Sequence, residues 1–315
     1  MIFEGLPNSV PSATGREFID GYRRFGRRSV DGSNGTYWLQ HGRFALMRFP
    51  AFALDSPTNR ELRRLFRSLR TPIVSYIRPV APGETFNSFL YIREKSYSRK
   101  TLERKPRQSI NRAHKYLRFS YLDWETLTRH GSEVYCNTRS RVGLSDGVES
   151  VFRREMTFFS NVPGHTAWGA WKEDRLIAFM IGAEVDDYYT LAMTCSSDDS
   201  LKWCPNNALF DGIFDFYLNT RRCRLVSAGL SSLQQGQQWE NLHRFKLHVG
   251  FDAIKVRRCF AVNPWFRPFI NRTVYRGTLG LQKLFPGNPL IRKGVGVYGI
   301  ILGLDQTMEE TEVVE

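Results

Sequence analysis

Apolar and polar positions alternate most regularly in the second half of the chain, where the alternation predicts three strands. The connections between them, residues 172–175 and 186–187, are short and polar, as antiparallel hairpins require. The predicted strands cover residues 165–171, 176–185 and 188–195. We therefore expect an antiparallel sheet at the centre of this half.

Apolar residues three and four positions apart predict helices on both sides of these strands. One helix starts at Pro205, because proline is favoured in a first helical turn, and another ends at Gly250, a typical C-terminal cap. The predicted helices cover residues 124–139, 150–159, 205–220 and 237–249, and shorter strands cover 119–122, 225–227 and 254–262.

The first 90 residues have the pattern of a smaller α/β unit. Two apolar runs are joined by a hairpin at residues 41–43, a helix follows Pro57, and two short strands come after it. The predicted strands cover 36–40, 44–49, 73–77 and 89–92. A basic helix is then expected over 98–115, which Pro106 must interrupt unless it lies in a first turn.

Positive charge is concentrated in two parts of the chain. The 315 residues include 45 Lys and Arg against 31 Asp and Glu, a net charge of +14. Residues 93–115 hold nine basic and two acidic residues, and residues 253–304 hold nine basic and no acidic ones. Such blocks are often solvated surface, but they also suit an anionic partner: nucleic acid, a nucleotide-bearing donor or an anionic lipid.

The two ends of the C-terminal region differ in charge and composition. Residues 264–304 interleave basic and aromatic residues, which suits a bilayer interface, single-stranded nucleic acid or, as readily, a packed helix. Residues 305–315 hold five acidic residues and no basic one, so we expect a disordered tail.

Composition excludes several classes of protein. Apolar residues at 42% and charged residues at 24% exclude a wholly disordered chain. The five cysteines include no Cys-x-x-Cys pair, which argues against a disulfide framework and a zinc site. No signal peptide is visible, and the longest apolar stretch, residues 294–304, is shorter than the ~20 needed to span a bilayer. We expect a cytoplasmic protein, at most peripheral to the inner face of the membrane.

Several known functional motifs are absent, or occur without the spacing or neighbouring elements that their function requires. The G-x-G-x-x-G pattern at residues 294–299 has no room for the helix and acidic partner that dinucleotide binding requires. No phosphate-binding P-loop or G-x-S-x-G elbow occurs. His243 and His248 are five residues apart, so they lie on different sides of a helix, and we expect no metal.

Two segments carry a more specific resemblance. The basic segment contains Arg107, then Ile110-Asn111-Arg112-Ala113 and Lys115, and is similar to the helix that links the halves of FemABX-type transferases. The segment 242–251, Leu-His-Arg-Phe-Lys-Leu-His-Val-Gly-Phe, resembles the Phe-Lys…Gly-Phe signature of those enzymes, which are built from tandem GNAT-like halves. The resemblance covers roughly residues 35–262 and includes relatives described as GNAT-type acetyltransferases.

The resemblance implies an α/β fold of two GNAT-like units, the C-terminal one complete, with a central mostly antiparallel mixed sheet flanked by helices. It also implies a domain organisation. The expected parts are a degenerate N-terminal unit at 1–95, a catalytic unit at 96–262 with the basic linker helix at its start, a basic aromatic extension at 263–304 and the tail at 305–315.

The resemblance further implies a catalytic role for Lys246. Acyl transfer to an amine needs a positive group or hydrogen-bond donors aimed at the oxyanion that develops on the carbonyl. In FemABX-type enzymes the lysine of the Phe-Lys pair is implied to supply that charge, and Phe245 would help to shape the donor channel. The alternative to these roles is that Lys246 is an exposed helix residue and that Phe245 is a core residue with a packing role only.

The donor is expected between the strands at 188–195 and 225–227, which splay in GNAT folds. Its phosphates would approach the N-terminus of the following helix, at Asn206, Asn207 and Ala208. The expected donor is acyl-CoA, with an aminoacyl-tRNA as the alternative. This chain lacks the Q/R-x-x-G-x-G/A segment of GNAT enzymes at that point, which argues against coenzyme A and is compatible with an aminoacyl-tRNA. Arg107, Arg112 and Lys115 are expected to bind the acceptor. Further polar candidates near the site are Tyr188, Tyr189, Asp211, Gln234 and Gln238.

The sequence thus predicts an N-acyltransferase of the GNAT/FemABX type. It would move an acetyl or aminoacyl group from a thioester or ester carrier to an amine of an amino sugar, peptide or cell-envelope precursor. The expected partners are an anionic donor and an amine acceptor, with membrane contact through 264–304 and nucleic acid only as a tRNA donor. Two alternatives are a non-catalytic nucleic-acid-binding protein and a degenerate GNAT-fold protein that holds a membrane complex through 264–304.

Overall fold

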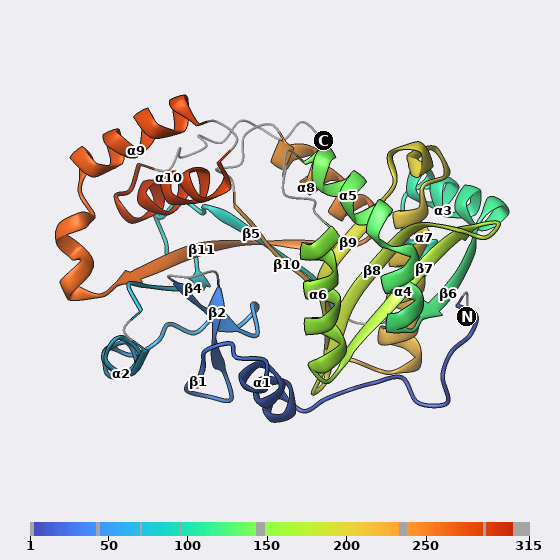
Figure 1. Ribbon diagram of the computed structural model, residues 1–315, viewed down its shortest axis with the longest axis horizontal. Coiled ribbons are helices and arrows are strands. Elements are labelled where there is room, and N and C mark those ends of the chain that lie inside the picture. Colours follow the sequence, from blue (N-terminus) through green and yellow to red (C-terminus); the bar gives the residue numbers. More distant parts are fainter. Residues whose placement is uncertain are drawn as a thin grey trace. The chain divides into compact units, whose positions relative to one another are not determined.

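The computed structural model describes residues 3–41, 45–69, 71–94, 96–142, 149–232, 238–285 and 288–304 (Figure 1). These residues form a mixed α/β fold in which most neighbouring strands are antiparallel and helices flank the strands. Parallel register occurs between β3 (Ala45–Phe49) and β4 (Ile73–Pro79) and between β9 (Tyr188–Ser196) and β10 (Leu225–Ser232). The predicted α/β class with a mostly antiparallel mixed sheet is confirmed.

The chain forms two compact units, each assembled from several segments. Unit 1 comprises Met1–Phe25, Tyr91–Gly229 and Leu242–Asp252, and unit 2 comprises Gly26–Leu90, Leu230–Asn241 and Ala253–Glu315. The linear boundaries after residues 95 and 262, and the tandem nature of the two halves, stay predictions.

Unit 1 contains the strands that the alternating pattern predicts. Their order is β10-β9-β8-β7-β6, with antiparallel pairing from β6 to β9. The strands that complete this list are β6 (Arg118–Leu122), β7 (His165–Lys172) and β8 (Arg175–Val185). The bounds of β7, β8 and β9 agree closely with the prediction, because their polar hairpin connections mark both ends. Strand β10 starts where expected but runs five residues further than the predicted 225–227.

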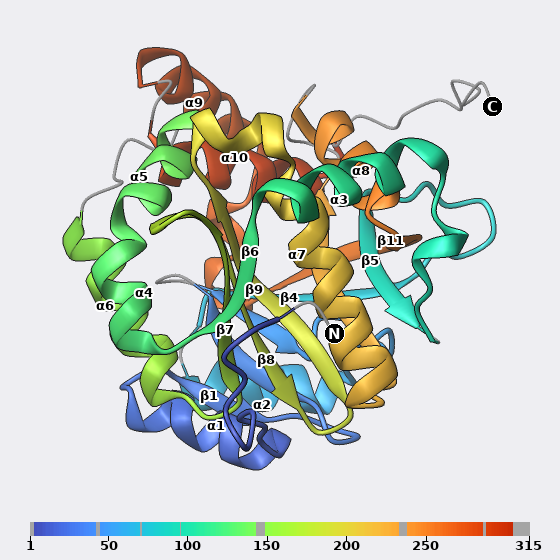
Figure 2. The same cartoon turned by 90° about the vertical axis from the view of Figure 1, so that its right-hand side faces the viewer.

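Helices cover both faces of these strands (Figure 2). One face carries α4 (Trp124–His130), α5 (Ser132–Arg141) and α6 (Glu149–Asn161), and the other carries α3 (Arg104–Tyr116) and α7 (Pro205–Phe214). The core between α4–α6 and the sheet is mostly apolar and also buries the hydroxyl group of Tyr135. It includes Leu127, Tyr135, Phe152, Phe179 and Ile181.

Two of the predicted helices differ from the structure. The helix expected over 124–139 is two helices that meet at Gly131, where a Cβ would lie 2.7 Å from the carbonyl oxygen of Leu127. The helix expected over 205–220 ends its α-helical part at Phe214 and continues as a π-helical turn over Asp215–Thr220. Pro106 lies in the first turn of α3, where its missing N–H leaves no hydrogen bond unmade.

The N-terminal residues belong to unit 1 and contain a helix that the sequence analysis missed. Helix α1 (Gly15–Arg24) begins at a capping box, in which the Thr14 side chain accepts from the backbone N–H of Glu17 and Glu17 binds the backbone N–H of Thr14. The Thr-x-x-Glu pattern was a readable signal for this start.

Helix α8 (Gln238–His248) ends as the sequence predicts. Gly250 follows it with φ +107°, a conformation that residues with a Cβ rarely adopt. This turn carries Phe251 into the core, where its ring meets those of Phe210 and Phe214 with centroids 5.4 and 4.9 Å away. The Gly-Phe pair is therefore explained by the helix stop and by packing against α7.

Unit 2 is a second set of strands with helix α2 (Asn59–Leu69) on one face. The strand order is β1-β2-β3-β4-β11. The strands of this order not yet given bounds are β1 (Ser29–Asp31), β2 (Tyr37–His41) and β11 (Asp252–Val262). Strand β5 (Ser88–Glu94) has its first three residues in unit 2 and the others, from Tyr91 on, in unit 1. Leu65 of α2 packs on Trp38, Leu46 and Val74, which form the buried centre of this face.

The basic aromatic segment of unit 2 is helical. It forms a 3-10 turn, η5 (Pro264–Phe269), followed by α9 (Arg272–Leu284) and α10 (Pro289–Ile301). No helix among the described residues is both long and apolar enough to cross a bilayer. The predicted disordered tail at 305–315 lies outside the described residues.

Substituting Gly250 tests the importance of the turn after α8. Gly250→Ala should lower the free energy of unfolding by about 1–3 kcal/mol, because alanine is strained at φ +107°. The matched control is Gly277→Ala in α9, where a Cβ meets no atom within 4 Å and helix propensity should raise stability by up to about 1 kcal/mol. Urea denaturation checks both, and equal effects of the two substitutions would contradict this account.

Candidate functional site

The parallel strands β9 and β10 of unit 1 pair over a short distance only. Their register joins Tyr188, Tyr189 and Thr190 of β9 to Leu225, Val226 and Ser227 of β10. Beyond Thr190, β9 continues to Ser196, but the described residues show no further pairing with β10. The splayed strands expected at this position are therefore present.

A β-bulge lies where the pairing ends. Leu191 pairs with Gly182 of β8 and Met193 pairs with Ile181, so Ala192 is an extra residue without a partner across the β8–β9 ladder. A bulge bends its strand and increases the local twist, and it can thus turn β9 away from β10. The Ala192 side chain is exposed to solvent.

The first turn of α7 holds the three residues predicted to bind donor phosphates. Cys204, the residue before α7, is in the left-handed conformation and its side chain makes no capping hydrogen bond. Asn206 and Asn207 are partly buried and Ala208 is fully buried. The predicted residues thus lie at a helix N-terminus, where backbone N–H groups and the helix dipole favour an anion.

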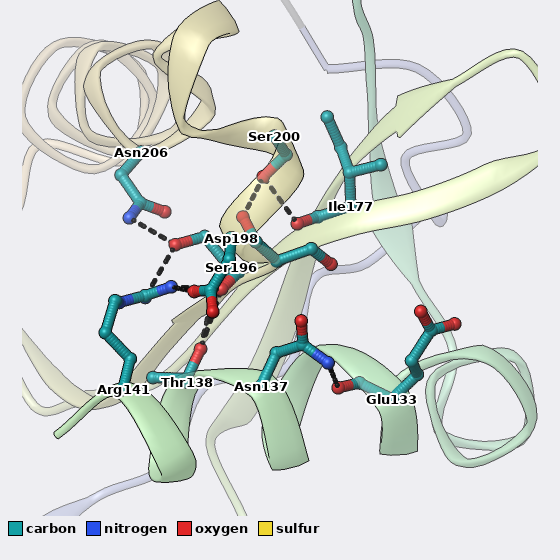
Figure 3. Close-up of polar contacts among 10 residues, drawn as sticks. Glu133, Asn137, Thr138, Arg141, Ile177, Ser196, Asp198, Ser200 and Asn206 are labelled. Atoms are coloured by element: carbon teal, nitrogen blue, oxygen red, sulfur yellow. Dashed lines mark hydrogen bonds and ion pairs between the residues drawn. The ribbon is translucent and has the colours of Figure 1, made fainter. Parts of the chain in front are cut away.

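Hydrogen bonds fix this turn to the end of β9 (Figure 3). From α7, Asn206 Nδ2 donates to Ser196 Oγ at 3.2 Å. From α5, Thr138 exchanges hydrogen bonds with the backbone of Ser196 at 2.8 and 3.0 Å, and Arg141 binds the Ser196 carbonyl oxygen at 3.1 Å. Arg141 also pairs with Asp198, so the negative charge of the 3-10 turn before α7, η2 (Asp198–Trp203), is compensated locally.

Lys246 points into unit 1 and is only 9% exposed. Its Nζ donates to the carbonyl oxygen of Ala228 at 3.3 Å and lies 4.1 Å from the centroid of the Tyr91 ring, in β5. Ala228 is the first residue of β10 after its pairing with β9 ends. Burial lowers the pKa of Lys246 to about 8, because desolvation disfavours the charged form. Most Lys246 side chains still carry an ammonium at pH 7.

Two further side chains at this position were not found from the sequence. Tyr91 is fully buried, and its Oη lies 2.7 Å from His243 Nδ1. Burial, and secondarily the charge of Lys246, lowers the pKa of His243, so its imidazole is neutral at pH 7. His243 and Lys246 are three residues apart on one helix, a spacing that was a readable signal for a shared face. Nothing in the sequence connects Tyr91 to them.

The Phe245 side chain mainly packs against α7. Its ring meets that of Phe210 in α7 with centroids 5.9 Å apart at 63°. The Phe245 side chain is partly buried, and its contact with Phe210 packs α8 against α7. A part in shaping a donor channel stays a prediction.

A buried carboxylate holds the basic linker helix in unit 1. Asp211 of α7 is 3% exposed and accepts from Tyr97 Oη at 2.8 Å and from Arg99 Nε at 3.0 Å, while His114 Nε2 of α3 lies 3.5 Å away. Burial alone would raise the pKa of Asp211, but these hydrogen bonds outweigh it and hold the pKa below its usual value. Asp211 is therefore occupied as an anchor, and its oxygens are engaged inside the protein.

The three basic residues expected to bind the acceptor are exposed on α3. Arg112 Nη1 reaches the carbonyl oxygen of Lys202 in η2 at 3.4 Å, next to the first turn of α7. Arg107 Nε lies 3.4 Å from the carbonyl oxygen of Glu103, and Lys115 Nζ lies 5.3 Å from the Tyr116 ring. The structure thus brings Arg112 close to the donor-binding candidates and does not bring the three together at one point.

The remaining polar candidates are placed as follows. Tyr188 and Tyr189 are buried, and the Tyr189 ring stacks on Tyr217 with centroids 3.7 Å apart. Gln234 lies outside the described residues, as does the side chain of Gln238. Across the described part of the chain, no three His, Cys, Asp or Glu side chains are placed to hold a metal ion.

Comparisons with known proteins bear on the fold. No protein-family model and no curated protein sequence matches the chain. Among solved structures, FemX matches with a TM-score of 0.55 at 11% identity, covering 80% of this chain and 92% of FemX. The C-terminal domain of a candidate lysylphosphatidylglycerol synthetase from Agrobacterium fabrum matches with a TM-score of 0.50 at 11% identity, covering 83% and 97%. The chain has a FemX-like fold, as the resemblance to FemABX-type transferases predicted.

Replacing Asp211 tests the anchor between α3 and α7. Asp211→Asn should lower the free energy of unfolding by about 3 kcal/mol at pH 7, because it leaves Arg99 without its buried partner. Asp199→Asn, which disrupts a largely exposed pair with Arg175, should change it by at most about 1 kcal/mol.

The same anchor predicts a pH dependence. The pKa of Asp211 is lower in the folded state than its unfolded value of 3.8. The contribution of the ionised carboxylate to the free energy of unfolding is therefore complete above pH 3.8 and is lost as pH falls through the folded-state pKa. Denaturation curves of the wild type and Asp211→Asn should therefore converge only below about pH 4. Convergence at neutral pH would contradict the anchor.

Proposed function

We propose that this chain is an N-acyltransferase whose reaction takes place where β9 and β10 separate. The single observation that carries the proposal is the position of Lys246: a buried ammonium bound to the carbonyl oxygen of Ala228, the first β10 residue past the paired segment. A FemABX/GNAT-like fold supports the class of reaction. The donor would carry an acetyl or aminoacyl group, and the acceptor would be an amine of an amino sugar, peptide or cell-envelope precursor.

The chemistry assigns a role to the charge of Lys246. The acceptor amine attacks the donor carbonyl carbon, a C–N bond forms, and the carbonyl electrons move to oxygen. The ammonium of Lys246 stabilises that oxyanion more than it stabilises the neutral carbonyl, which lowers the barrier. When the intermediate collapses, the carrier sulfur or oxygen leaves with the bond's electron pair.

A neutral imidazole can complete the proton balance. The attacking nitrogen loses one proton, and the leaving sulfur or oxygen gains one. His243 is neutral at pH 7, and a hydrogen bond to Tyr91 holds its ring. We assign to His243 the transfer of that proton, with Tyr91 as the residue that orients the imidazole.

An anionic carrier would bind along α7 and α3. The N-terminus of α7 offers backbone donors, and the contact of Arg112 with η2 supports a role for that arginine at the donor. Arg107 and Lys115 are exposed further along α3 and remain our candidates for an anionic, for example diphosphate-linked, acceptor. The donor is acyl-CoA or an aminoacyl-tRNA.

Substitutions of Lys246 test the proposed transfer. Lys246→Met should lower kcat by about 10²–10³ while the protein stays folded, because it removes the charge that faces the oxyanion. Lys246→Arg retains a charge and should keep more of the rate. In the wild type the rate should fall as pH rises through about 8, the pKa of Lys246, and in Lys246→Arg this fall should be absent. Unchanged kcat in Lys246→Met would refute the proposal and leave nucleic-acid binding as the alternative.

The donor can be identified by its effect on melting temperature. We expect either an acyl-CoA or an aminoacyl-tRNA to raise Tm. At a ligand concentration a hundredfold above Kd, binding should increase the free energy of unfolding by about 2.7 kcal/mol. Asn207→Asp should weaken that effect, because it adds a negative charge in the first turn of α7. It should not lower the Tm of the free protein, since an acid is favourable at a helix N-terminus. No shift with either donor class would contradict the proposed anion site.

A further inference from the structure

Seven of the twelve large apolar side chains that the described residues expose lie between residues 264 and 304. Two belong to η5: Trp265 is 55% exposed and Phe269 is 54% exposed. Four belong to α9 or follow it directly, namely Val274, Leu281, Leu284 and Phe285. We call these six residues the apolar surface. All of them belong to unit 2.

The residues on α9 form one stripe. At 100° per residue, Val274, Leu281 and Leu284 fall within an arc of about 80°, and Phe285 follows directly after the helix. The adjacent arc of the helix contains Thr278, which faces α10: a Cβ on Gly294 would lie 3.9 Å from its methyl group. Figure 1 shows α9 and α10 side by side. One side of α9 is therefore used for packing, and the apolar stripe is left facing solvent.

Positive charge lies on the same elements, and on α9 it lies on the side roughly opposite the apolar stripe. Arg267, Arg272, Arg276 and Lys283 are exposed on the same elements, and the described residues place no carboxylate within 4.0 Å of any of them. Residues 253–304 contain no acidic residue at all. Exposed apolar and aromatic side chains among unopposed cations are the composition of segments that lie in the interface of an anionic bilayer.

We propose that η5 and α9 bind the surface of an anionic lipid bilayer, with the apolar surface entering the boundary between head groups and acyl chains. Lys and Arg side chains are long enough to reach the phosphates while their helix lies in the interface. Leu284, at 72% the most exposed large apolar side chain among the described residues, lies at the end of α9 beside Phe285 and leads this insertion. The contact is peripheral and independent of acyl transfer.

Two other occupants fit the same observations less well. A second copy of the chain would bring together two sets of cations that have no acidic partner among the described residues, and like charges facing each other oppose association. Single-stranded nucleic acid would use Trp265 and Phe269 for stacking, but Val274, Leu281 and Leu284 have no aromatic face to offer a base. Lipid acyl chains accept all six side chains.

Vesicle sedimentation with the full chain tests the proposal. We expect binding to phosphatidylcholine vesicles that contain phosphatidylglycerol, much weaker binding to phosphatidylcholine alone, and loss of binding as salt rises. Leu281→Ser with Leu284→Ser should weaken the partition constant by tenfold or more, because each removes apolar burial. Arg272→Gln with Arg276→Gln should also weaken it by about tenfold or more, and only on anionic vesicles.

Controls separate this surface from the rest of the molecule. Tyr116→Ser with Leu201→Ser removes two apolar side chains of unit 1 that are comparably exposed, and vesicle binding should not change. Lys246→Met should also bind vesicles normally, so a failure of the proposed transfer chemistry and a failure of this proposal are distinguishable.

Several results would overturn the proposal. One is that the folded protein fails to sediment with anionic vesicles at low salt, and another is that it binds neutral and anionic vesicles equally. Binding that Leu281→Ser with Leu284→Ser leaves unchanged would also contradict the proposal. A dimer that Leu281→Ser with Leu284→Ser dissociates, without vesicle binding, would assign the surface to a second copy. Oligonucleotide binding with the same sensitivity, again without vesicle binding, would assign it to nucleic acid.

Discussion

The site depends on the end of backbone pairing between β9 and β10. Parallel strands in a sheet normally continue to pair, because every unpaired N–H and C=O needs another partner. Here the register stops at Thr190 and Ser227, and the bulge at Ala192 follows immediately. Just beyond this point in β10, the Ala228 carbonyl oxygen accepts from Lys246 Nζ and the Gly229 N–H donates to Ser227 Oγ. Ala228 is the first β10 residue past the paired segment, and Asn206 ties the first turn of α7 to Ser196 at the end of β9.

Burying the ammonium of Lys246 costs free energy in the folded state. Removing an ammonium from water is unfavourable, and this desolvation lowers the pKa of Lys246. The Ala228 carbonyl and the face of Tyr91 recover part of the lost hydration through a hydrogen bond and a cation–π contact. A group that is costly to bury and that sits where a sheet opens is typical of a functional position, because packing alone would have favoured an apolar residue.

The sequence predicted elements whose signals are local and missed those that depend on tertiary contacts. Strands β7–β9 were predicted closely because alternation and polar turns occur within each segment. The break at Gly131 was not, because no proline marks it and the close approach to Leu127 is visible only in three dimensions. The π-helical turn after Phe214 has no sequence signature that we recognise.

The same distinction applies to the site. Lys246 and the first turn of α7 follow from motif and helix-start patterns, and the structure positions them without testing their roles. Tyr91 could not be found, because it lies far from His243 in sequence and reaches it only through the fold. Asp211 was a candidate near the chemistry, but Tyr97, Arg99 and His114 engage it as an anchor. Long-range partners of this kind are set by topology, which local patterns do not encode.

The low pKa of Lys246 also has a chemical consequence for the side chain itself. An amine with a pKa near 8 is neutral in about a tenth of molecules at pH 7, roughly three hundred times the fraction for a lysine with a pKa of 10.5. A neutral amine is a nucleophile. Beside an activated acyl group, Lys246 would compete with the true acceptor for the carbonyl carbon, so selective transfer requires that its lone pair not reach that atom. Its tether to the Ala228 carbonyl provides such a restraint, because it directs the N–H bonds and fixes the nitrogen's position.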